Sequence, residues 1–216
     1  MESAPLRIDL FADVVCPWCF VGHERLERVL ASTGRAARIT HHPFMLDPHT
    51  PPEGDDIPAR LRRKYGVPPE QLWARLEAEA RKSGLELDLA KQRLSYPTAR
   101  AHTLIRHAEA KGDGRQDALV RDLYRANFMD ARNIHDPDVL VDVAAPHGFA
   151  ADEVLRLVTD DAELATTREV AQAAAATGID GVPFFVFGER IAVAGAQPES
   201  VLAAAIEKAV AVSAAG

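Results

Sequence analysis

Residues 15–20 read Val-Cys-Pro-Trp-Cys-Phe and contain both cysteines of this 216-residue chain, Cys16 and Cys19. Before this stretch, apolar and polar residues alternate over residues 6–10, which is the pattern of a strand. After it, apolar residues recur every three or four positions until Gly34, which predicts a helix that ends at this glycine. The two cysteines are therefore expected at the point where a strand passes into a helix.

Farther along the chain, the same patterns predict a second strand, a long helical region, a β-hairpin and a final helix. Prolines and acidic residues dominate residues 48–58, and we place the start of the helical region there. From about residue 57 to 177 the apolar spacing is helical and contains no convincing strand. The predicted elements occupy residues 38–42, 57–177, 183–195 and 198–212.

Without its helical region, the chain would have the order strand, helix, strand, hairpin and helix. A CxxC pair at the first strand-to-helix junction of such a core is typical of a thioredoxin-like redox motif. We therefore predict an α/β protein with a thioredoxin-like fold that is interrupted by a large all-helical insertion. The thioredoxin-like domain is assigned to residues 1–50 and 178–216, and the helical insertion domain to residues 51–177.

Composition and charge narrow the classes of function. Apolar residues make up 47% of the chain and charged residues 26%, the balance of an ordinary globular protein. The net charge of −7 arises from 32 acidic and 25 basic residues spread along the chain, so nucleic acid and membranes are not expected as partners. The N-terminus lacks the pattern of an export signal, and no apolar run reaches the ~20 residues of a membrane span. We expect a cytoplasmic protein, where a lone CxxC pair serves redox chemistry or half of a metal site rather than a structural disulfide.

The positions of the two thiols predict different roles for them. A helix N-terminus carries unpaired N–H groups and a partial positive charge, which would stabilise a thiolate at Cys16. Because the thiolate is the attacking species in disulfide exchange, Cys16 is the predicted nucleophile. Cys19 would lie one turn deeper in the helix and is the predicted resolving thiol. Between them, Trp18 is expected to form an apolar lip of the substrate surface.

The stretch Gly181-Val182-Pro183 opens the predicted hairpin. In a thioredoxin-like core this loop faces the CxxC pair. We predict a cis peptide bond at Pro183, which would leave the backbone of Val182 free to pair with an extended substrate as an added strand.

Half of a zinc site is the main alternative use of the two cysteines. A structural zinc ion usually takes four ligands, so two histidines from among His23, His41 and His42 would have to join them. His41 and His42 are adjacent and would point to opposite faces of a strand. The sequence has no second CxxC pair, and we predict no metal. In the helical region, His102 and His107 are expected to be packed or surface residues.

Together these motifs resemble those of the DsbA family of thioredoxin-fold oxidoreductases, in particular its FrnE-like cytoplasmic branch. The resemblance extends over nearly the whole chain and is most specific around the cysteines and Pro183. It implies dithiol-disulfide oxidoreductase activity at Cys16 and Cys19, with a cis-Pro183 beside them. The matching blocks are residues 13–22, 42–46, 98 with 101–102, 178–185 and 195–198.

Two related groups, the 2-hydroxychromene-2-carboxylate isomerases and the kappa-class glutathione transferases, are similar in layout and use a serine at the position of Cys16 to activate glutathione. Cysteine at both positions favours dithiol chemistry here. In thioredoxins and DsbA proteins, a buried acid six residues before the first cysteine commonly accepts the proton of the resolving thiol. This chain has Leu10 there, and Asp9 and Asp13 are expected to project differently, so the proton acceptor of Cys19 is left open.

We therefore predict a thiol-disulfide oxidoreductase that exchanges disulfides with protein or small-thiol substrates. One alternative is a glutathione-dependent isomerase or transferase, in which Cys16 only polarises a glutathione thiol; another is a non-enzymatic binding module. We expect no cofactor, with glutathione as the candidate co-substrate, and a homodimer could form through the helical insertion. The predicted catalytic residues are Cys16 and Cys19, and the predicted substrate-binding residues are Pro17, Trp18, Phe44, Val182 and Pro183.

Overall fold

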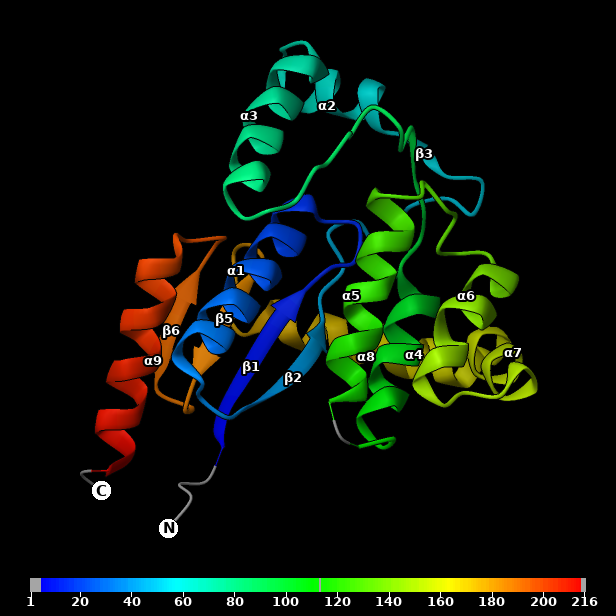
Figure 1. The fold of residues 1–216 in the computed structure, drawn as a ribbon. Helices are drawn as coiled ribbons and strands as arrows, with labels where there is room; N and C mark the ends of the chain where they lie inside the picture. Colours follow the sequence, from blue (N-terminus) through cyan, green and yellow to red (C-terminus); the bar gives the residue numbers. More distant parts are fainter. Residues whose placement is uncertain (1–4, 113, 215–216) are drawn as a thin grey trace.

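The computed structural model describes residues 5–112 and 114–214 of the chain. Its central feature is a four-stranded sheet with the strand order β2-β1-β5-β6 (Figure 1). The first strand runs parallel to β2 and antiparallel to β5, which pairs with β6 as a hairpin. The strands are β1 (Leu6–Ala12), β2 (Ala37–Pro43), β5 (Phe184–Phe187) and β6 (Ile191–Ala194).

The alternating pattern of β1 and β5 places large apolar side chains on the buried sides of the sheet. Ile8 lies opposite Phe187 and Leu10 opposite Phe185, and all four side chains are fully buried. Burial of each such side chain contributes roughly 1.5–3 kcal/mol to folding. The predicted first strand and hairpin are confirmed.

Two helices, one near each end of the chain, belong to the same part of the fold as the four-stranded sheet. Helix α1 (Pro17–Thr33) begins directly after the turn that follows β1, and it ends at Gly34, which has a left-handed conformation with φ of 60°. Helix α9 (Glu199–Ala214) packs against α1 and the hairpin. In Figure 1, α1 lies in front of the sheet and α8 lies behind it. The predicted helices at both places are confirmed.

The region between β2 and the hairpin is mainly helical, as predicted. It also contains a two-stranded antiparallel sheet of β3 (Asp55–Asp56) and β4 (Leu94–Ser95), which the pattern did not predict. Strands of two residues are too short to produce an alternating pattern, and their pairing depends on contacts far apart in sequence. The helices are α2 (Ile57–Tyr65), α3 (Pro69–Lys82), α4 (Ala99–Glu109), α5 (Arg115–Phe128), α6 (Pro137–Ala144), the 3-10 helix η1 (Ala145–His147), α7 (Ala151–Thr159) and α8 (Asp161–Ala176).

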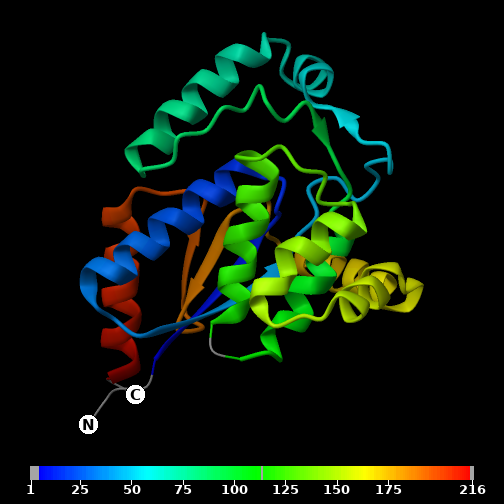
Figure 2. The ribbon, with the colours of Figure 1, turned by 45° about the vertical axis from the view of Figure 1, so that its right-hand side comes forward.

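The helical region packs on the sheet in two different ways. Helices α4, α5 and α8 contact β2, whereas α2 and α3 form an arch beyond the N-terminal end of α1 (Figure 2). The contact between α1 and α5 is aromatic: Phe20 stacks on Tyr124 and Phe128, with ring centroids 5.1 and 6.0 Å apart. Since one hydrophobic cluster joins the two regions, their division into separate domains stays a prediction.

Within the described residues, no helix is long and apolar enough to cross a membrane.

Candidate active site

The two cysteines lie at the strand-to-helix junction, as predicted. Cys16 is the N-cap residue of α1 and has an extended backbone, with φ of −93° and ψ of 110°. Pro17 is the first helical residue, where a missing N–H group costs nothing because this group would have no helical partner. The carbonyl of Cys16 accepts the N–H groups of Cys19 and Phe20 at 3.0 and 3.2 Å. Cys16 therefore sits at the positive end of the helix, and Cys19 one turn inside it.

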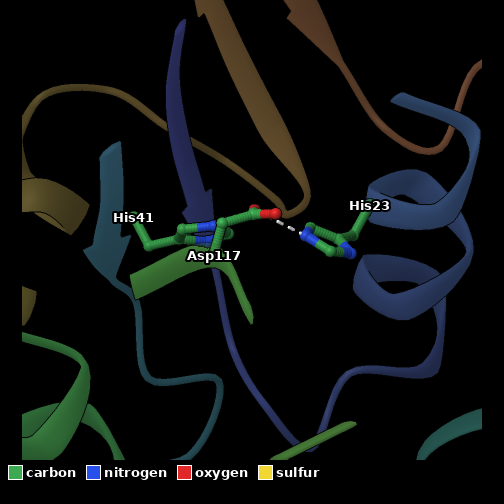
Figure 3. A group of neighbouring side chains, drawn as sticks. All are labelled: His23, His41 and Asp117. Atoms are coloured by element: carbon green, nitrogen blue, oxygen red, sulfur yellow. Dashed lines mark hydrogen bonds and ion pairs between the residues drawn. The ribbon is translucent and has the colours of Figure 1, made fainter. Parts of the chain in front are cut away.

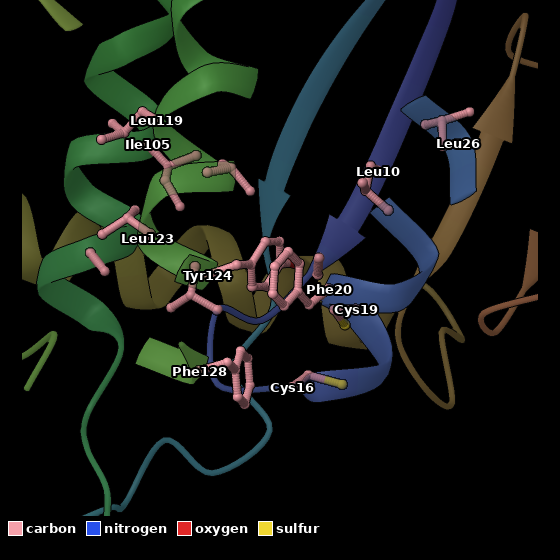
Figure 4. Close-up of a cluster of buried hydrophobic side chains, with 14 of the residues drawn as sticks. Leu10, Cys16, Cys19, Phe20, Leu26, Ile105, Leu119, Leu123, Tyr124 and Phe128 are labelled. Carbon is pink, nitrogen blue, oxygen red and sulfur yellow. The ribbon is translucent and has the colours of Figure 1, made fainter. Parts of the chain in front are cut away.

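The two thiols differ in environment. Both are free, and Cys16 is 5% exposed whereas Cys19 is fully buried. Burial raises the pKa of Cys19 well above its usual value, and the hydrogen bond and charge of Cys16 raise it further. Figure 4 shows both cysteines beside the rings of Phe20 and Phe128. The pair thus consists of an outer sulfur at the helix end and an inner sulfur that remains a thiol.

The loop before β5 faces this pair. The Val182–Pro183 peptide bond is cis, which confirms the predicted conformation. The carbonyl oxygen of Val182 lies 3.9 Å from Cys16 Sγ and accepts its S–H group. Because Val182 is half-buried and Pro183 buried, the main chain at this loop forms one wall beside the outer thiol.

Gly22 explains how the loop comes so close to α1. An added Cβ at Gly22 would lie 2.8 Å from Cγ of Pro183 and 3.2 Å from Cζ of Phe185. Real Cβ atoms do not make contacts as short as the first of these. The absence of a side chain at this helical position therefore lets Pro183 rest against the helix that carries the cysteines.

We expect the Gly22→Ala variant to be less stable by about 1 kcal/mol. Overpacking costs about 1–3 kcal/mol, which outweighs the gain of about 1 kcal/mol from helix propensity. The free energy of unfolding from denaturant titration measures the effect. Gly181→Ala is the matched control: no described atom comes within 4 Å of an added Cβ there, and we expect a change below about 0.5 kcal/mol. A Gly22→Ala variant as stable as the parent would contradict this role.

The other predicted substrate-binding residues surround the same junction. Pro17 and Trp18 are half-buried, and Trp18 packs against the hydrophobic core. Phe44 directly follows β2 and donates its N–H group to the carbonyl of Ala12 at 3.1 Å, and its side chain is buried. Their contacts with a substrate stay a prediction.

A buried pair next to Cys19 was missed by sequence reasoning. Asp13 is 1% exposed, and its Oδ1 lies 3.1 Å from Nε2 of the equally buried His102, while its Oδ2 accepts the N–H group of Leu46 at 2.9 Å. The charge of the Asp13 carboxylate raises the pKa of Cys19, whereas the main chain of Asp13 lowers it. Leu10, at the position where related proteins commonly have an acid, is a fully buried apolar residue.

The sequence held a partial signal for this pair. Asp13 belongs to the block around the cysteines, and His102 to the block that begins at Thr98, but nothing in either block shows that the two meet. His102 was expected to be a packed or surface residue; it is packed, and it also has a buried acidic partner. The neighbouring Asp9 projects differently, as expected, and bonds His42 at 2.8 Å.

The histidines considered as zinc ligands point to other partners. His23 and His41 both bond Asp117 of α5, and His42, on the opposite side of β2, bonds Asp9 and stacks on Phe11. Among the described residues, the cluster suited to a metal ion contains His23, His41 and Asp117 and neither cysteine. The cysteines are therefore not joined to these histidines in one ligand set.

Comparisons with known proteins give a consistent family assignment. The family model of the DSBA-like thioredoxin domain matches residues 7–207. A solved structure of a probable DsbA oxidoreductase from Streptomyces coelicolor is 34% identical, with a TM-score of 0.83 over 95% of this chain and 90% of that chain. The fold is also similar to a 2-hydroxychromene-2-carboxylate isomerase (17% identity, TM-score 0.66, 96% and 98% covered). A third similar structure is the cytosolic disulfide reductase DsbM from Pseudomonas aeruginosa with GSH (19% identity, TM-score 0.60, 97% and 98% covered).

Proposed function

Because the chain belongs to the DSBA-like thioredoxin domain family, we propose that it is a thiol-disulfide oxidoreductase whose redox couple is Cys16 and Cys19. The observation that carries the proposal is the asymmetry of the two thiols. One sulfur lies at the helix N-terminus beside the Val182–Pro183 loop, and the other is buried one turn behind it. Such an arrangement provides one attacking and one resolving group.

The proposed reduction of a substrate disulfide has two steps. The Cys16 thiolate attacks one substrate sulfur, so that a mixed disulfide forms, the substrate S–S bond breaks and the first substrate thiolate leaves. Cys19 then gives up its proton and attacks the Cys16 sulfur, which releases the second substrate thiolate and leaves a Cys16–Cys19 disulfide. The substrate gains two electrons and the enzyme loses two. A substrate dithiol that attacks the Cys16–Cys19 disulfide runs the same steps in reverse.

Asp13 is the proposed proton acceptor for Cys19. It is the acid whose charge acts on the pKa of this thiol, and its carboxylate is held by His102 and the Leu46 N–H group. Each carboxylate oxygen has two lone pairs, so both oxygens retain acceptor capacity beside these hydrogen bonds. His102 is proposed to act on the reaction by positioning Asp13.

The substrate is proposed to lie along the Val182–Pro183 loop. An extended segment there could add to the sheet through the main chain of Val182, with Trp18 and Phe44 providing apolar contact on the α1 side. The exchange requires no cofactor, and glutathione is a candidate small-thiol partner because the similar DsbM structure contains GSH. We place this chemistry in the cytoplasm, where thiol buffers turn such dithiols over.

Equilibration in glutathione buffers of graded redox ratio tests the proposal. After alkylation, intact-mass analysis distinguishes free thiols, a glutathione adduct and an internal disulfide. We expect the population to pass directly from two free thiols to the Cys16–Cys19 disulfide, because the inner thiol resolves any adduct at the outer one. A stable adduct with glutathione would contradict the dithiol cycle and support the glutathione-dependent isomerase or transferase alternative, which the likeness to the isomerase fold favours.

A further inference from the structure

A second cluster of polar side chains lies farther along α1, and the dithiol chemistry makes no use of it. His23 of α1, His41 of β2 and Asp117 of α5 point toward one another from three elements (Figure 3). Nε2 of His23 lies 2.8 Å from Oδ1 of Asp117, and Nε2 of His41 lies 2.7 Å from the same oxygen. All three ligand atoms fall within 4.8 Å of one another.

The cluster is enclosed, and its histidines have a single partner. The side chain of His23 is fully buried, that of His41 is 4% exposed, and that of Asp117 is 15% exposed. Nδ1 of both histidines is buried without a hydrogen-bond partner among the described residues. Each imidazole therefore makes its hydrogen bond through Nε2, and both bonds go to Oδ1 of Asp117.

The donor atoms suit metal ligation. Oδ1 of Asp117 faces Nε2 of both histidines, so two imidazole nitrogens and a carboxylate oxygen converge on one point. Imidazole nitrogen and carboxylate oxygen are both ordinary zinc ligands.

Two flanking residues form the outer edge of the cluster. Glu27 follows His23 by one helical turn of α1. Arg121 forms an ion pair with Glu27 and lies 3.8 Å from Oδ2 of Asp117. The side chains of Glu27 and Arg121 are 28% and 36% exposed, so this edge of the cluster borders solvent.

We propose that His23, His41 and Asp117 form a binding site for one divalent transition-metal ion of the zinc class, with these three side chains as its protein ligands. Two imidazole nitrogens with a carboxylate oxygen suit zinc, cobalt and nickel better than the hard ions magnesium and calcium. Ligand atoms at about 2.0–2.2 Å from a tetrahedral zinc lie about 3.3 Å from each other. Starting from 2.7 and 2.8 Å, the histidines would need to move from Asp117 by only about half an ångström.

The proposal is independent of the proposed redox function. None of the proposed metal ligands is a cysteine, and the metal site lies one turn of α1 beyond Cys19. It differs also from a zinc site at the CxxC pair, which would need both thiolates. Failure of one proposal therefore leaves the other standing.

Metal titration of the Cys16→Ser/Cys19→Ser double variant tests the site, because this variant has no thiol to bind the ion. We expect one equivalent of Co²⁺ to bind with visible absorption of an N/O ligand set, and Zn²⁺ to displace it. The melting temperature should rise with Zn²⁺ concentration, because the ion binds the native state. In NMR spectra, the ring signals of His23 and His41 should shift at one equivalent of Zn²⁺, and those of His147 should not.

Ligand variants in the same background locate the ion. Loss of a residue that only hydrogen-bonds a metal ligand costs about 10- to 100-fold in metal affinity. Asp117 and His41 would bind the ion directly, so Asp117→Asn and His41→Gln should each weaken metal binding by more than about 100-fold. His147→Gln is the matched control: it too removes a buried imidazole that bonds an aspartate of α5, Asp122, at 2.9 Å, and affinity should not change. Absence of binding, or unmoved ring signals at saturating Zn²⁺, would overturn the proposal. Binding that survives Asp117→Asn would also overturn it.

Discussion

Replacing Cys16 by serine is expected to lower the rate of disulfide exchange by more than about 1,000-fold, because a serine hydroxyl is not ionised near neutral pH and is a poor nucleophile. Cys16 is the outer sulfur at the start of α1, and the other sulfur is fully buried, so no second group can make the first attack. The measurement uses a chromogenic aromatic disulfide in excess, whose released thiol is followed by stopped-flow absorbance.

Cys19→Ser is the informative partner of this variant. The outer sulfur and the Val182–Pro183 loop remain in place, so we expect the first attack to proceed within about tenfold of the parent rate. The reaction should then stop, and intact-mass analysis should find one substrate thiol attached to Cys16. Repeated turnover by Cys19→Ser in the presence of glutathione would contradict the dithiol mechanism and favour activation of glutathione by Cys16 alone.

The features that the sequence predicted correctly are those with local causes. Alternation over residues 6–10, the helical spacing after Cys19 and the glycine at position 34 each depend on neighbours in the chain. The position of the CxxC pair follows from these elements alone. The cis peptide at Pro183 was predicted from its place at the start of the hairpin and from the family resemblance.

The features that were missed depend on contacts between distant segments. Asp13 meets His102 across 89 positions of sequence, and His23 meets Asp117 across 94. No spacing rule connects such residues, since helix and strand periods describe only one element at a time. His23 and His41 were considered as ligands for a metal held by the cysteines, whereas their partner is an aspartate on a helix of the inserted region.

Related proteins commonly place an acid six residues before the first cysteine, where this chain has the buried Leu10, so the sequence left the proton acceptor of Cys19 open. Asp13, after β1, is a buried acid whose charge acts on the pKa of Cys19. The turn holds Asp13 in place because its carbonyl accepts the N–H group of Cys16 at 3.0 Å. His102 of α4 and the main chain of Leu46 hold its two carboxylate oxygens. The helical region therefore contributes directly to the position of the proposed proton acceptor.

Replacing Asp13 by asparagine should separate this proton transfer from the fold. The amide can still accept the Leu46 N–H group through its oxygen, and its NH₂ group can donate to Nε2 of His102 if the imidazole carries its proton on Nδ1. The change therefore removes the base and keeps the shape of the side chain, and in that tautomer of His102 it keeps both hydrogen bonds. Asp9→Asn is a matched control, because Asp9 is also a buried acid bonded to a histidine, His42, but it lies away from the thiols.

We expect Asp13→Asn to slow the resolving step by about 10²- to 10⁴-fold near neutral pH, the usual contribution of a positioned base. With the chromogenic disulfide in excess, the first release of thiol reports the attack by Cys16 and the second reports the attack by Cys19. Only the second phase should slow, and its rate should rise in proportion to hydroxide concentration, because hydroxide must then remove the proton of a thiol whose pKa burial has raised. Asp9→Asn should leave both phases unchanged. A second phase with the parent rate and pH profile in Asp13→Asn would show that Cys19 loses its proton directly to water, and Asp13 would then have only a structural role.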